Sequence, residues 1–152
     1  MPKRSAGLLL HRAVDGGPQV LIAHPGGPFW VHKDDGAWSV PKGEYGPEED
    51  PWDAAVREFT EELGMAPPAG ARIDLGTFRQ PSGKLLTVFA VAGDLDINGM
   101  HSNTFEVEWP KGSGVMRSFP EIDRAGWFSI AQARRKLHNG QVPVLDRLLS
   151  VW

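Results

Sequence analysis

The feature that most restricts the possible folds of this chain is one sharply delimited helix near its middle. Asp50 is a favourable N-cap, and Pro51 suits the first helical position because no amide donor is needed there. Gly64 suits the position after the helix, where a positive φ is required, and Pro67-Pro68 prevents any continuation. The sequence therefore predicts a helix over residues 51–63.

The predicted helix has two chemically different faces. At about 100° per residue, apolar side chains gather in one arc and acidic side chains in a second arc, separated from the first. We therefore expect one face to pack in a core and the other to present three carboxylates together. The apolar arc consists of Trp52, Val56, Phe59 and Leu63, and the acidic arc of Glu58, Glu61 and Glu62.

The acidic arc has two possible explanations. Like charges at i, i+3 and i+4 repel one another, at roughly 0.2–0.5 kcal/mol per pair, and Arg57 is the only cation on the helix. By itself, a Glu-x-x-Glu-Glu pattern is most simply a solvated acidic face. Clustered carboxylate oxygens are also the ligands that Mg²⁺ or Mn²⁺ prefers, and such an ion can bridge to substrate phosphates.

The residues around the helix distinguish these explanations. The segment from Gly43 to Met65 resembles the signature of the Nudix hydrolase family at every defining position, over 23 of the 152 residues. Seven fixed residue types coincide by chance on the order of once in a billion windows, so the resemblance favours a metal site. The matching residues are Gly43, Glu49, Arg57, Glu58, Phe59, Glu61, Glu62, Gly64 and Met65.

The resemblance implies a role for each polar residue of this segment. Glu49 and Arg57 resemble an ion pair that tethers the loop to the catalytic helix, and a planar guanidinium suits a bidentate carboxylate contact. The implied cofactor is Mg²⁺ or Mn²⁺, and the implied reaction is attack of water on a phosphorus atom. The residues similar to the family's metal ligands are Glu58, Glu61 and Glu62, with the Gly43 carbonyl as a backbone ligand.

The general base varies among Nudix enzymes between a helix glutamate and a carboxylate from a later loop. Position favours Glu58 as the base. Glu121 is the best candidate outside the segment, because it precedes a predicted strand in a Pro-rich loop, although a surface glutamate is the simpler explanation. Glu106 and Glu108 compete with it, but an alternating strand more often exposes both to solvent.

A phosphate-containing substrate also needs cationic and apolar contacts. Lys42 is the predicted substrate-binding residue because its neighbour Gly43 is placed at the site, whereas Lys33, Arg79 and Lys84 are more simply surface charge. A nucleobase needs a flat apolar surface on which to stack. The candidates are Phe29, Trp30, Phe105 and Trp109, although core packing explains each of them more simply.

The rest of the chain alternates between strand and helix patterns. Strands mixed with helices predict an α/β protein, and the resemblance makes it a Nudix-type α/β/α sandwich with a central mixed β-sheet. The length fits a single domain over residues 1–152. The predicted strands cover residues 6–11, 19–24, 38–40, 73–79, 85–91, 105–109, 115–119 and 127–128, and the further helices cover residues 130–137 and 144–149.

Composition narrows the possible partners and location. The net charge of −3 gives no global basic field that would draw the chain onto nucleic acid or an anionic membrane, and no apolar segment approaches the length of a membrane span. The absence of cysteine excludes disulfides and thiolate metal sites and is compatible with a cytoplasmic protein. We expect a small-molecule nucleotide as the partner, and many Nudix relatives suggest a homodimer.

Residues outside the signature decide the substrate. The run from Trp38 to Gly43 is similar to the corresponding segment of dinucleoside polyphosphate and diphosphoinositol polyphosphate hydrolases, which favours a nucleoside or dinucleoside polyphosphate. Pro81 stands where ADP-ribose-type enzymes often have a proline, but the chain has 13 prolines. An ADP-ribose-type nucleotide-sugar pyrophosphatase and a non-catalytic nucleotide-binding module are therefore the alternatives.

Overall fold

The computed structural model of the chain describes residues 2–152 and has a six-stranded sheet at its centre. The strands of this sheet are β1 (Arg4–Val14), β2 (Gly17–Pro25), β3 (Lys42–Glu44), β4 (Arg72–Arg79), β5 (Leu85–Ala92) and β8 (Ile122–Ser129). Their order is β4-β5-β1-β2-β8, with β3 paired to β1. β1 and β5 are parallel and the other pairs are antiparallel, so the predicted mixed sheet is confirmed.

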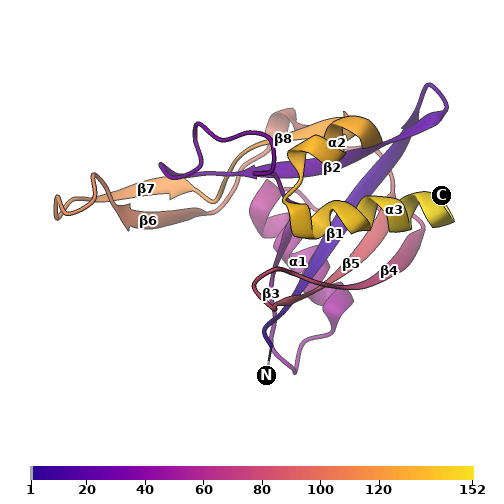
Figure 1. Cartoon of the computed structure of the whole chain (residues 1–152), viewed down its shortest axis with the longest axis horizontal. Helices are drawn as coiled ribbons and strands as arrows, with labels where there is room; N and C mark the ends of the chain where they lie inside the picture. The colour runs from indigo at the N-terminus through magenta and orange to yellow at the C-terminus, as the bar shows by residue number, and fades with distance from the viewer. Residues whose placement is uncertain (1) are drawn as a thin grey trace.

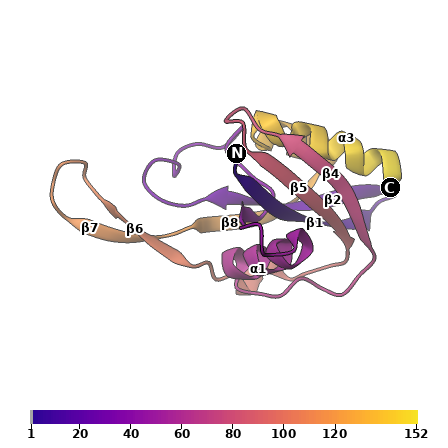
Figure 2. The ribbon, with the colours of Figure 1, turned by 90° about the horizontal axis from the view of Figure 1, so that it is seen from below.

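Helices cover both faces of the sheet (Figures 1 and 2). One face carries α1 (Pro51–Leu63), and the other carries α2 (Ile130–Lys136) and α3 (Val142–Val151); two short 3₁₀ turns are η1 (Ile97–Gly99) and η2 (Asn139–Gln141). Consecutive strand residues point to opposite faces, so Leu8 and Leu10 join the apolar cluster under α1 while Leu9 joins the cluster under α2 and α3. The predicted α/β/α sandwich is confirmed. Among residues 2–152, no helix is long and apolar enough to cross a membrane.

The bounds of α1 agree with the prediction because local hydrogen bonds fix both ends. The Asp50 side chain accepts hydrogen bonds from the amides of Trp52 and Asp53, at 3.0 and 3.2 Å. Gly64 adopts a φ of 71°, and its amide donates to the Thr60 carbonyl at 2.8 Å. The helix that carries the acidic arc is therefore capped by its own sequence.

The segment before α1 differs in detail from the prediction. The strand expected at residues 38–40 is reduced to isolated bridges at Trp38 and Ser39, and regular pairing with β1 begins only at Lys42. Pro41, which has no amide to donate, separates the two stretches. Lys42 and Gly43 consequently lie within a strand and not in the loop that follows it.

β6 (Thr104–Glu108) and β7 (Met116–Pro120) form a separate two-stranded sheet that projects from the sandwich (Figures 1 and 2). Residues 104–120 are called the arm below. The sequence predicted both strands but not their departure from the central sheet. The loop after β2 runs along the arm, where the rings of Phe29 and Trp109 meet edge to face at 5.4 Å. Such contacts stabilise a hairpin that would be marginal by itself.

Candidate active site

Gly43 brings the backbone of β3 against the acidic face of α1. A methyl group built at Gly43 would lie 2.0 Å from Cδ of Glu58, so any side chain at this position would overlap the carboxylate. Glycine is therefore required here by a close approach. The Glu58 side chain and the Gly43 backbone are near enough to belong to one group of oxygen donors.

Arg57 joins the loop before α1 to the helix. Its Nε donates to Oε2 of Glu49 at 2.9 Å and its Nη2 donates to Oε1 at 2.8 Å, which makes a bidentate pair. These bonds hold the pKa of Glu49 below its ordinary value. Through Nη1 the same guanidinium donates to Glu58 at 2.9 Å and to Glu61 at 3.5 Å. The structure thus contains the expected ion pair, which also restrains two of the predicted metal ligands.

Burial distinguishes the carboxylates of this face. The Glu62 carboxylate lies against β3, and burial raises its pKa to about 8, although the Lys42 amide donates to it at 2.9 Å. Burial also raises the pKa of Glu58, while Arg57 acts in the opposite direction. A buried carboxylate is costly to ionise unless a cation lies close to it. This face therefore favours a bound cation.

Glu121 joins these carboxylates from the base of the arm. The pKa values of Glu58 and Glu62 are raised mainly by burial, and the negative charge of Glu121 raises both further. The Glu121 amide donates to the Asn103 carbonyl at 2.8 Å, and the Asn103 amide donates to the Glu61 carbonyl at 3.2 Å. Main-chain bonds thus tie Glu121 to α1, and the fold brings this distant residue to the helix glutamates.

The other two acidic candidates belong to the arm. Glu106 and Glu108 are exposed on β6. The Glu108 carboxylate accepts a hydrogen bond from the Gly112 amide at 2.6 Å and so closes the turn of the arm. The exposure of Glu106 and Glu108 supports the expectation that both side chains lie in solvent, and not that either is the general base.

The donor atoms at this site fit a hard divalent cation. Carboxylate and carbonyl oxygens are the ligands that Mg²⁺ and Mn²⁺ prefer. Within residues 2–152, however, no three acidic or histidine side chains already surround a common point at coordinating distance. The contacts explain this, because Nη1 of Arg57 lies between Glu58 and Glu61. A cation would replace these two contacts of Nη1, while Glu49 keeps Arg57 in place.

A cleft of about 490 Å³ opens beside Lys42. One wall of the cleft depends on Gln141, which is buried; it accepts from the Val40 amide at 2.8 Å and donates to Oγ of Ser39 at 2.9 Å. Lys42 therefore lies between the carboxylates and a cleft large enough for part of a nucleotide. The lining residues include Trp30, Trp38, Lys42, Lys84, His138 and Gln141.

The cleft separates the aromatic candidates by position. Trp30, 39% exposed, lines the cleft, whereas Phe29, Phe105 and Trp109 make contacts along the arm and the loop beside it. Sequence reasoning missed the contribution of Gln141, because its partner Val40 lies 101 positions away in the chain. No local pattern marks such a residue, and only the packing of η2 against this loop reveals it.

A mixed sheet between two helical layers, in which a glycine of a short strand lies against a glutamate-rich helix, defines the class of Nudix folds. The sequence model of the NUDIX domain matches residues 1–148, and the chain belongs to this family. A search among curated proteins finds no match.

Solved structures share the fold over nearly the whole chain. The Ap4A hydrolase of C. elegans in a binary complex is 19% identical, with a TM-score of 0.64 over 97% of this chain and 96% of that one. The NUDIX domain of Shewanella oneidensis NrtR, complexed with ADP ribose, is 14% identical, with a TM-score of 0.66 over 99% and 88%. RenU, a Nudix hydrolase from M. smegmatis, is 25% identical, with a TM-score of 0.58 over 97% and 83%.

Proposed function

We propose that this Nudix protein is a pyrophosphohydrolase that uses a divalent metal ion to cleave a phosphoanhydride bond in a nucleoside diphosphate-linked substrate. A nucleoside or dinucleoside polyphosphate is the proposed substrate class, and one domain spanning residues 1–152 performs the reaction. The observation that carries the proposal is the gathering of Glu58, Glu62 and Glu121 beside Gly43. The mutual repulsion of these carboxylates opposes folding. A bound cation would offset this repulsion and could also bind substrate phosphates.

The residues have separate tasks in this proposal. When bound, Mg²⁺ or Mn²⁺ offsets the charge of the phosphates and lowers the pKa of water. Glu58 accepts the proton of the attacking water, whose oxygen bonds to phosphorus as the bond from phosphorus to the leaving phosphate breaks. Glu121 is the alternative base, and Arg57 with Glu49 positions the helix. The groups that would hold the ion are Glu58, Glu61, Glu62 and the Gly43 carbonyl.

The cleft supports a nucleotide as the substrate. Lys42 touches both regions, because its amide binds Glu62 while the residue lines the cleft. We assign the Lys42 ammonium to a substrate phosphate and the exposed Trp30 ring to stacking on the nucleobase. The likeness to a C. elegans Ap4A hydrolase agrees with a dinucleoside polyphosphate. Because the similar NrtR domain binds ADP ribose, the alternative proposal is an ADP-ribose-type pyrophosphatase.

A substrate panel tests this function. Dinucleoside polyphosphates, nucleoside triphosphates and ADP-ribose are incubated with Mg²⁺ or Mn²⁺, and released phosphate, pyrophosphate and mononucleotide are measured. We expect turnover of a polyphosphate, with Glu61→Gln lowering kcat about 100-fold or more and Glu106→Gln, on the arm, leaving it unchanged. The protein is instead a non-catalytic nucleotide-binding module if no nucleotide is cleaved and if added metal changes the nucleotide affinity of neither Glu61→Gln nor Glu106→Gln.

A further inference from the structure

A second hollow adjoins the cleft at the edge of the sheet. Its volume is about 640 Å³, and Ser82 and Lys84 line both the hollow and the cleft, so the two are adjacent. The residues that line the hollow are Pro2, Lys3, Arg79, Ser82, Gly83 and Lys84, three of them cationic. We call this second region the basic hollow.

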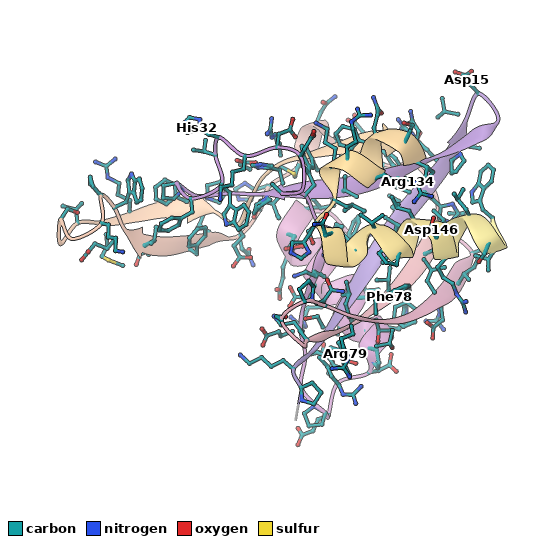
Figure 3. All side chains as sticks on the ribbon, in the orientation of Figure 1. Asp15, His32, Phe78, Arg79, Arg134 and Asp146 are labelled. Carbon is teal, nitrogen blue, oxygen red and sulfur yellow. The ribbon has the colours of Figure 1, made fainter. Side chains whose placement is uncertain are left out.

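Strand register brings the three cations together. Leu85 in β5 pairs with Arg4 of β1 on one side and with Arg79 of β4 on the other. The Leu85 amide also donates to the Lys3 carbonyl at 2.9 Å. Lys3 and Lys84 directly precede β1 and β5, and Arg79 is the last residue of β4, so the three cations lie at the same end of three neighbouring strands, where Figure 3 labels Arg79.

The basic hollow has more positive than negative charge. Glu44 Oε2 accepts from Nζ of Lys84 at 2.9 Å, and Oε1 lies 3.8 Å from Nζ of Lys3. Among the described residues, no other acidic side chain lies within ion-pair distance of these two lysines, and none does so for Arg79. One carboxylate thus faces three cations, in a chain whose net charge is −3. Such a local excess of positive charge attracts a compact anion.

The basic hollow also lies close to the proposed site of cleavage. Lys42 and Glu44 are two residues apart in β3 and so share one face of that strand. Lys42 and Lys84 both line the cleft, and Lys84 also lines the basic hollow together with Lys3 and Arg79. A row of cations that begins at a reacting phosphate suits further phosphates of the same chain, and arginine binds them through its planar fork.

We propose that the basic hollow is a second anion subsite, which binds the phosphate groups of an oligophosphate chain beyond the bond that is cleaved. This inference rests on the proposed function and sharpens it. An oligophosphate chain has phosphate groups beyond the cleaved bond that the hollow would bind, whereas the diphosphate of ADP-ribose has none. The subsite therefore selects polyphosphates over nucleotide sugars.

Binding of inorganic tripolyphosphate, measured by calorimetry on the full chain in EDTA, tests the subsite without any turnover. Arg79→Gln is expected to weaken binding about tenfold, as loss of a charge-assisted contact predicts. Glu44→Gln removes the competing carboxylate and is expected to tighten binding. Arg117→Gln, the same charge change on the exposed surface of the arm, is the matched control. Equal affinities of Arg79→Gln and Arg117→Gln for tripolyphosphate would overturn the proposal.

Kinetics test the selectivity. Arg79→Gln should raise KM for a dinucleoside tetraphosphate about tenfold while kcat stays within about twofold of wild type, and KM for ADP-ribose should not change. An equal rise in both KM values contradicts selection of long chains. If neither compound is cleaved, the proposed function fails, and the tripolyphosphate measurement still decides whether the subsite exists.

Discussion

At the scale of single residues, Gly43 is a position where any side chain would overlap the Glu58 carboxylate. In Gly43→Ala the new methyl group would lie 2.0 Å from Cδ of Glu58, so the carboxylate or β3 must move. We expect a loss of about 1–3 kcal/mol in unfolding free energy and a fall of about 100-fold in kcat. Denaturant titration and steady-state kinetics measure the two effects.

The loop that follows β3 contains a matched control for this substitution. Gly46→Ala adds the same methyl group three residues away, where no atom lies within 4 Å, and Gly46 does not have a positive φ. We expect it to retain wild-type stability and kcat. If both alanine variants behave alike, the close approach of Glu58 to Gly43 does not matter for the enzyme.

Arg57 is the second residue whose geometry makes a prediction. Arg57→Lys keeps the charge but cannot reproduce two parallel hydrogen bonds to Glu49 while also reaching Glu58. We expect kcat to fall about 10- to 100-fold with a smaller change in KM, because the helix is mispositioned and the substrate contacts are intact. Kinetics of Arg117→Lys on the arm provide the comparison. A rise in KM at unchanged kcat would instead make Arg57 a substrate-binding residue.

At the scale of elements, a buried histidine joins β2, β8 and the loop that carries Trp30. Nδ1 of His24 lies 2.8 Å from the Asp123 carboxylate and Nε2 lies 2.6 Å from the Lys33 carbonyl. The ring therefore bridges β8 and the loop, with one polar contact at each of its nitrogens. The side chain is fully buried, which makes it a fixed link between strands and loop.

Removal of this link has a predictable cost. His24→Phe fills the space but leaves the Asp123 carboxylate and the Lys33 carbonyl without their contacts to the ring. We expect the unfolding free energy to fall by about 1–3 kcal/mol, because a buried hydrogen-bonding partner is lost. His32→Phe, at an exposed position in the same loop, should change it by less than about 0.5 kcal/mol. Similar denaturation midpoints for the two variants would show that His24 is not a structural link.

The elements also show which parts of the fold were predictable from sequence. The bounds of α1 were correct because Asp50 and Gly64 act within one turn of the helix ends. Both strands of the arm were predicted, but their separation from the central sheet was not, because an alternating pattern indicates a strand and not the strand with which it pairs. The residues of the candidate site also differ in how far the sequence predicts them. The helix glutamates share one local pattern, whereas the contact of Gln141 with Val40 depends on long-range packing.

At the scale of the whole molecule, charge is segregated although its sum is only −3. The acidic group that includes Glu58, Glu62 and Glu121 lies on one side of Lys42, and the basic hollow lies on the other. An acidic group repels a free nucleotide, so in the proposed function we expect a bound metal ion to reverse the sign of the local charge before substrate binds. Metal binding and nucleotide binding should therefore be positively coupled.

That coupling makes a thermodynamic prediction for the folded protein. The glutamates lie outside the two apolar clusters, so the chain should stay folded in EDTA while activity is lost, and added Mg²⁺ should restore the activity. Because the folded state alone presents the assembled site, Mg²⁺ at about ten times its Kd should raise the unfolding free energy by about 1.4 kcal/mol. Thermal denaturation measures this increase, which should disappear in Glu61→Gln and persist in Glu106→Gln. A Tm that responds equally to Mg²⁺ in both variants would move the metal away from α1.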